Sequence, residues 1–102
     1  LGPGDAVLVI HRGPEQGARF ELKQPLVTVG RGSDSTIFLD DVTVSRRHAE
    51  LKRSDTGWTL SDVGSLNGSY VNKNLIDTQV LTTGDEVQIG KYRFIFAQAP
   101  VA

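Results

Sequence analysis

Three short segments of this chain carry side chains that can bind an anion, and each lies where an expected strand meets a loop. They are Gly30-Arg31, Ser45-Arg46-Arg47-His48 and Leu66-Asn67-Gly68. Their guanidinium, hydroxyl and carboxamide groups are the donors that hold a phosphorylated side chain and hydrogen-bond the backbone around it. If the three loops converge in space, the sequence predicts a site that binds a phosphorylated peptide.

Other chemistry fits these segments less well. Ser45 and His48 lack the Gly-x-Ser-x-Gly motif of a nucleophilic serine, and residues three apart on an extended strand point to opposite faces. We therefore expect no catalytic residue and no enzyme. The glycines at 30–32 form an incomplete dinucleotide fingerprint, and segment 64–68 lacks the lysine of a P-loop. The aspartates at 40, 41 and 62 do not match a calcium loop. We interpret them as turn caps, and we expect neither metal nor cofactor.

Each donor also has a purely structural interpretation. Arg31 could be a solvated surface side chain, Ser45 a turn cap, and Asn67-Gly68 the dipeptide of a hairpin turn. His48 is better explained as a structural histidine that holds a neighbouring loop than as a group that touches a ligand. These interpretations explain the residues singly. They do not explain why such residues occur together at three separated loops, so the binding hypothesis is favoured.

Length and composition are typical of a globular domain. With 102 residues, 38% of them hydrophobic, the chain predicts a single domain over residues 1–102, with frayed ends at 1–5 and 98–102. No cysteine is present, no apolar stretch approaches about 20 residues, and no signal peptide is visible. We therefore expect a cytoplasmic protein that does not bind membranes. A net charge of -1 argues against nucleic-acid binding. Because the first residue is leucine, we expect a fragment of a longer protein.

Alternation of apolar and polar residues predicts an all-β fold. It recurs over residues 19–23, 58–61, 86–89 and 91–96, with turn signals at 12–17, 55–57, 72–74, 83–85 and 90–91. Short strands at this spacing are typical of a sandwich or barrel. Residues 45–53 contain good helix formers behind a serine suited to an N-cap. Alternation of Ala49 and Leu51 with polar neighbours nevertheless favours a strand over 45–53.

Taken in order, the motifs Gly30-Arg31, Ser45-x-x-His48 and Asn67-Gly68 resemble those of the forkhead-associated (FHA) domain. The resemblance spans nearly the whole chain and implies an FHA-type β-sandwich of about eleven strands, with ligand-binding loops at one end. It implies two sets of site residues. The phosphothreonine-binding set is Arg31, Ser45, Arg46, Leu66 through its backbone N–H, and Asn67 through the peptide main chain. The loop-structuring set is Gly30, His48 and Gly68.

Segments 4–25, 37–50, 62–72 and 84–96 are further similar to the actinobacterial GarA/OdhI-type regulators. That likeness implies a phosphothreonine-containing partner, either a Ser/Thr kinase or the protein's own phosphorylated N-terminal tail. It also implies 2-oxoglutarate dehydrogenase or glutamate dehydrogenase as candidate targets. The alternatives are an adaptor that recruits other phosphorylated partners, such as a kinase, and a scaffold that needs no phosphate. Two features depart from the family: the 102 residues include no such tail, and GRGSDSTI stands where a GRHP-like loop is expected.

Overall fold

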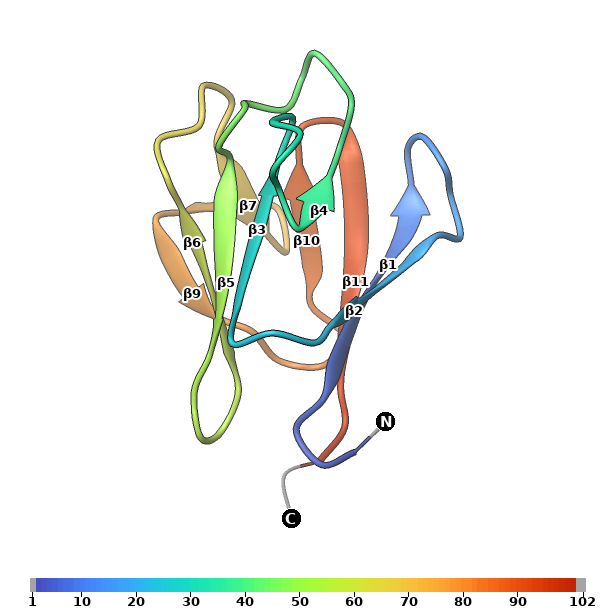
Figure 1. Ribbon diagram of the computed structural model, residues 1–102, viewed down its shortest axis with the longest axis vertical. Helices are drawn as coiled ribbons and strands as arrows, with labels where there is room; N and C mark the ends of the chain where they lie inside the picture. Colours follow the sequence, from blue (N-terminus) through green and yellow to red (C-terminus); the bar gives the residue numbers. More distant parts are fainter. Residues whose placement is uncertain (1, 101–102) are drawn as a thin grey trace.

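The computed structural model describes residues 2–100, which form two β-sheets packed against one another (Figure 1). In chain order the strands are β1 (Ala6–Arg12), β2 (Arg19–Leu22), β3 (Leu26–Gly30), β4 (Ile37–Phe38), β5 (Ala49–Arg53), β6 (Trp58–Asp62), β7 (Ser69–Val71), β8 (Asn74–Ile76), β9 (Thr78–Val80), β10 (Glu86–Ile89) and β11 (Tyr92–Gln98). One sheet has the order β2-β1-β11-β10-β7-β8, and the other has the order β4-β3-β5-β6-β9. The prediction of an all-β sandwich of about eleven strands is confirmed. No helix within residues 2–100 is long and apolar enough to cross a membrane.

The core between the sheets is built from the apolar positions that alternate along the strands. In β11, Tyr92, Phe94 and Phe96 are buried while the residues between them are partly exposed. The facing sheet contributes Trp58 and Leu60 of β6, both fully buried, to the same apolar cluster. Burial of each large apolar side chain stabilises the fold by about 1.5–3 kcal/mol. The four alternating stretches coincide with β2, β6, β10 and β11, so the periodicity located these strands correctly.

The strand predicted over residues 45–53 is correct only from Ala49 onward. Residues 49–53 form β5, which pairs with β3 on one side and β6 on the other. Residues 45–48 instead form a loop, because the carbonyl oxygens of Ser45 and Arg46 accept hydrogen bonds from the backbone of the 31–32 segment. The geometric reason given above for separating Ser45 from His48, an extended strand, is therefore wrong.

The loops that carry the predicted site residues gather at one end of the sandwich, and the two termini lie toward the other (Figure 1). The connections at the site end are β3–β4 (residues 31–36), β4–β5 (39–48) and β6–β7 (63–68). The short strand β4 runs parallel to β3, whereas every other strand pair is antiparallel. Because β3 and β4 point the same way, both strands deliver the chain to the site end.

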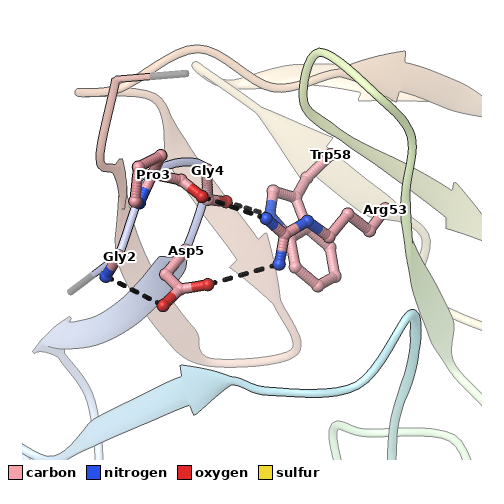
Figure 2. A network of polar contacts seen from close by, with 6 residues as sticks. All are labelled: Gly2, Pro3, Gly4, Asp5, Arg53 and Trp58. Carbon is pink, nitrogen blue, oxygen red and sulfur yellow. Dashed lines mark hydrogen bonds and ion pairs between the residues drawn. The ribbon is translucent and has the colours of Figure 1, made fainter. Parts of the chain in front are cut away.

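Hydrogen bonds hold residues 2–5, which belong to the first of the two segments, 1–5 and 98–102, that we expected to be frayed. Figure 2 shows the indole N–H of Trp58 donating to the carbonyl oxygen of Gly4 at 3.3 Å. The guanidinium of Arg53 donates to the Pro3 carbonyl and the Asp5 carboxylate. The backbone of residues 4–5 also exchanges hydrogen bonds with Ala99. Residues 1, 101 and 102, which the expectation included, lie outside the described residues.

We predict that Trp58→Phe destabilises the domain by about 1–3 kcal/mol, because it removes buried volume and leaves the Gly4 carbonyl without its donor. Arg53→Ala is the matched control, because Arg53 also hydrogen-bonds to the N-terminal segment. It should change the free energy of unfolding by less than about 1 kcal/mol, since that side chain is 37% exposed. Urea denaturation of both variants checks this. Equal losses would show that the buried indole is no more important than its exposed neighbour.

Candidate functional site

Arg31 is fixed against the β4–β5 loop by both its backbone and its side chain. Its backbone N–H donates to the carbonyl oxygen of Ser45 at 2.9 Å, and its side-chain Nε donates to the carbonyl oxygen of Val44 at 3.1 Å. The residue is exposed, and its two terminal guanidinium nitrogens have no hydrogen-bond or ion-pair partner within residues 2–100. The anchored Nε limits the motion of the side chain, so these two nitrogens form a two-pronged donor for an anion.

Ser45 connects the β4–β5 loop to the β6–β7 loop. Its Oγ accepts a hydrogen bond from the backbone N–H of Leu66 at 2.9 Å, which leaves the hydroxyl proton able to donate. The Leu66 N–H, expected above to be available to a phosphate, therefore already has an acceptor. With Arg31 bonded to one side of Ser45 and Leu66 to the other, the three predicted segments meet around this serine.

The carboxamide of Asn67 makes a second connection between the same two loops. Its Nδ2 donates to the carbonyl oxygen of Thr43 at 3.0 Å, and Asn67 is otherwise exposed. The carboxamide oxygen accepts no hydrogen bond within the described residues, so it can accept one from a ligand. Arg46 joins the cluster through its backbone, because its carbonyl oxygen accepts from the Gly32 N–H at 3.1 Å. Its side chain is exposed.

His48 lies beneath the cluster and is completely buried. Its Nδ1 accepts a hydrogen bond from the Ser45 backbone N–H at 3.1 Å, so the ring proton is on Nε2, which donates to the carbonyl oxygen of Gly68 at 2.9 Å. One ring thus holds the β4–β5 and β6–β7 loops together. Because both ring nitrogens bond to backbone groups, the imidazole is not a base for the Ser45 hydroxyl.

Gly30 and Gly68, both predicted to shape the loops, are required to be glycine for different reasons. A β-carbon at Gly30 would overlap the carbonyl oxygen of Arg46, so the need for glycine comes from close backbone approach. Its φ is not positive, so a left-handed backbone conformation is not the reason for glycine at this position. Gly68 has both constraints: its φ is +87°, and a β-carbon would lie 2.6 Å from Cδ1 of Leu75.

Comparison with known proteins decides the family. Residues 9–100 match the family model described as "Inner membrane component of T3SS, cytoplasmic domain". The chain is 57% identical over 102 residues to an oxoglutarate dehydrogenase inhibitor of Corynebacterium efficiens, covering 100% of this chain and 72% of the relative. It is 56% identical over 100 residues to the glycogen accumulation regulator GarA of Mycobacterium tuberculosis, covering 98% of this chain and 62% of GarA.

A solved structure from an analysis of phosphothreonine-dependent FHA domain interactions superposes with a TM-score of 0.86 at 29% identity, covering 95% of this chain and 99% of that one. The chain belongs to the FHA family. Its β-sandwich superposes on that of a solved FHA domain, and its curated relatives include the oxoglutarate dehydrogenase inhibitor and GarA. This FHA domain spans 72% of the first relative's length and 62% of the second's.

Asp62 organises the β6–β7 loop of this FHA domain and was recognised from the sequence only as a turn cap. Its Oδ1 accepts from the backbone N–H groups of Gly64 and Ser65, both at 2.9 Å. Its Oδ2 accepts from the hydroxyls of Ser65 and Ser69. Burial of the carboxyl opposes its ionisation, but the hydrogen bonds from these serines and amides outweigh burial and lower the pKa of Asp62 below 3.8.

Asp41 lies within the β4–β5 loop and links it to the β10–β11 turn. Its Oδ1 accepts from both the hydroxyl and the backbone N–H of Thr43, at 2.6 and 2.9 Å. Its Oδ2 lies 2.9 Å from Nζ of Lys91, whose backbone N–H donates to the Thr43 hydroxyl. The Thr43 hydrogen bonds, followed by the Lys91 ion pair, lower the pKa of Asp41 to about 2. The same ion pair raises the pKa of Lys91.

Some of the contacts that these aspartates make could be predicted from the local sequence. The interpretation of Asp41 and Asp62 as turn caps agrees with their contacts. The sequence signal for such a cap is a serine or threonine two or three positions after the aspartate. Asp40 makes no hydrogen bond within residues 2–100. The role of Lys91 was missed, because it depends on a contact between segments far apart in the chain.

We predict that Gly30→Ala lowers the free energy of unfolding by about 1–3 kcal/mol, because the new β-carbon forces the 30–32 segment away from the Arg46 carbonyl. Gly57→Ala is the control, since its β-carbon would lie at an ordinary 3.6 Å from Gln98 Oε1. It should change stability by less than about 0.5 kcal/mol. Chemical denaturation of both variants makes the comparison. A harmless Gly30→Ala would mean that the two loops are not in close contact.

The lowered pKa of Asp41 predicts how the loop responds to acid. Because its pKa is about 2 in the folded chain against an ordinary 3.8, ionised Asp41 stabilises the loop above about pH 4. That stabilisation is lost as the pH falls toward 2. In an NMR titration, the amide signals of Thr43 and Lys91 should shift with a midpoint near 2, and Asp41→Asn should abolish this transition. A midpoint near 3.8 would show that the carboxylate is not held by these contacts.

Proposed function

We propose that this FHA domain binds phosphothreonine within an extended peptide, and that it acts by binding and not by catalysis. The observation that carries the proposal is the anchoring of Arg31, which has two free guanidinium nitrogens, to the Val44 and Ser45 carbonyl oxygens of the loop whose Ser45 hydroxyl can still donate. A phosphate ester carries a charge of about -1.5 to -2 at neutral pH and three strong acceptor oxygens. Two guanidinium donors and one hydroxyl match that acceptor set.

In the proposed complex, Arg31 binds two phosphate oxygens and the Ser45 hydroxyl donates to a phosphate oxygen. The exposed side chain of Arg46 adds a second positive charge next to Ser45 in the chain. Each charge-assisted hydrogen bond contributes about 1.5–3 kcal/mol, so two or three of them are enough to separate a phosphorylated peptide from an unmodified one. The phosphate thus determines whether a peptide binds.

The β6–β7 loop has a different part in this proposal. The carboxamide oxygen of Asn67 accepts a hydrogen bond from a main-chain N–H of the peptide, while its nitrogen stays on the Thr43 carbonyl. Because the Leu66 N–H donates to Ser45 Oγ, we assign Leu66 to positioning the serine and not to direct phosphate contact. The buried ring of His48 and the glycines at 30 and 68 keep the loops at the required separation.

We further propose that the full-length protein is a cytoplasmic regulator of 2-oxoglutarate-metabolising enzymes in kinase signalling. The name of the C. efficiens relative, an oxoglutarate dehydrogenase inhibitor, supports this. The phosphorylated partner would be a Ser/Thr kinase or a phosphorylated tail of the protein itself, and the regulated enzymes 2-oxoglutarate dehydrogenase or glutamate dehydrogenase. The occupied ring nitrogens of His48 oppose the alternative of a serine hydrolase.

Arg31→Ala should weaken binding of a phosphothreonine peptide by about a hundredfold or more, because two charge-assisted hydrogen bonds are lost. The melting temperature should change little, since the substitution removes a single side-chain hydrogen bond, to the Val44 carbonyl, and keeps the backbone bond to Ser45. Lys52→Ala is the control, an exposed cation on β5 that should leave affinity unchanged. Calorimetric titration gives the affinities.

The same titration with the unphosphorylated peptide separates the proposal from a scaffold that needs no phosphate. The proposal requires the unmodified peptide to bind far more weakly to the wild-type domain. Equal affinities for the two peptides would contradict phosphate recognition. A large fall in melting temperature for Arg31→Ala would make Arg31 a structural residue.

A further inference from the structure

Asn67 and Gly68 are the only Asn-Gly pair in the chain, and they lie in the exposed β6–β7 loop. Asparagine loses its side-chain amide most readily when glycine follows, because the backbone nitrogen of a residue without a β-carbon reaches the side-chain carbonyl carbon with little hindrance. We propose that Asn67 is a latent deamidation site, protected by hydrogen bonds that hold both nitrogens of the reaction, and that it reacts when those bonds open.

The reaction needs only water. The backbone nitrogen of Gly68 attacks Cγ of Asn67 and forms a new C–N bond, and the bond from Cγ to Nδ2 breaks. Ammonia leaves with the proton that the Gly68 nitrogen gives up, and a five-membered succinimide remains. One water molecule then opens either carbonyl of that ring. The product at position 67 is aspartate or isoaspartate, whose main chain is one carbon longer.

A hydrogen bond holds the attacking nitrogen, that of Gly68, and hinders the attack. The N–H of Gly68 donates to Ser65 Oγ at 2.9 Å. Ser65 Oγ in turn donates its own proton to Oδ2 of Asp62, so the hydroxyl is oriented with a lone pair toward Gly68. To attack, the Gly68 nitrogen must lose its proton and turn toward Cγ, and both changes break this bond. Loss of one such bond changes an equilibrium by about two- to tenfold.

The leaving nitrogen is held as well. Nδ2 of Asn67 donates to the Thr43 carbonyl at 3.0 Å, which fixes the carboxamide against the neighbouring loop. Asn67 is exposed, so water reaches it freely and burial does not protect it. Of the two protecting hydrogen bonds, only the one from Asn67 to Thr43 joins the β4–β5 and β6–β7 loops. A change that separates these loops therefore frees the leaving nitrogen, whereas the Gly68–Ser65 bond lies within the β6–β7 loop.

The consequence for binding rests on the proposed function, whereas the deamidation itself does not. A carboxylate at position 67 has no proton to donate, so its oxygen would face the Thr43 carbonyl oxygen and be repelled. It would also place a negative charge on the rim where we propose that a phosphate binds. Isoaspartate would further lengthen the loop at the residue assigned to the peptide main chain. Deamidation would thus switch the site off irreversibly.

The test measures deamidation of the full chain by mass spectrometry, after incubation at mildly alkaline pH with no peptide present. Ser65→Ala removes the acceptor of the Gly68 N–H and should speed amide loss at Asn67 by about two- to tenfold. Ser65→Thr keeps a hydroxyl and should react like the wild type. Ser69→Ala is the matched control, because Ser69 bonds to the same Asp62 oxygen but not to Gly68. Asn72 and Asn74, which no glycine follows, are references within the same molecule.

Equal rates for Ser65→Ala and the wild type would overturn the proposal, as would equally fast loss in Ser69→Ala. If Ser65→Ala does not fold, the native and urea-unfolded wild-type chains decide the question. The native chain should lose the Asn67 amide about tenfold more slowly, as two protecting hydrogen bonds imply, and equal rates would refute protection. Because no peptide is present, these outcomes are independent of whether the domain binds phosphothreonine.

Discussion

The site of this FHA domain depends on two backbone hydrogen bonds that join the end of β3 to the β4–β5 loop. The N–H groups of Arg31 and Gly32 donate to the carbonyl oxygens of Ser45 and Arg46. Only a glycine at position 30 lets the two backbones approach this closely. These bonds hold the backbone of Arg31 against that of Ser45 and use neither the guanidinium nor the hydroxyl.

Three further groups of contacts hold the loops in place. The buried ring of His48 bridges the β4–β5 and β6–β7 loops, the Asp62 carboxylate gathers the amides and hydroxyls of the β6–β7 loop, and the Asp41–Lys91 pair supports the β4–β5 loop from the β10–β11 turn. Both carboxylates have a lowered pKa because their partners favour the ionised form. A site prearranged in this way needs little ordering when a ligand binds.

Much of this arrangement could be predicted from the sequence, for identifiable physical reasons. Period-two alternation located β2, β6, β10 and β11, since a half-buried strand requires it. It misplaced the start of β5, because residues 45–48 bond to a distant loop and local pattern carries no sign of that. The resemblance pointed to Arg31, Ser45 and Asn67 as one group. Three features could not be predicted, because each depends on a tertiary contact. They are the acceptor of the Leu66 N–H, the requirement for glycine at position 30 and the ion pair of Lys91.

The most direct measurement is an NMR titration with a phosphothreonine peptide and its unphosphorylated counterpart. If the three loops form one rim, the amide signals of Arg31, Ser45 and Leu66 should shift along a single saturation curve with the phosphorylated peptide only. The signal of the indole N–H of Trp58, which hydrogen-bonds to Gly4 in the N-terminal segment, should not shift. Separate curves for the three loops, or shifts at Trp58 without shifts at the loops, would contradict a shared phosphate-binding site.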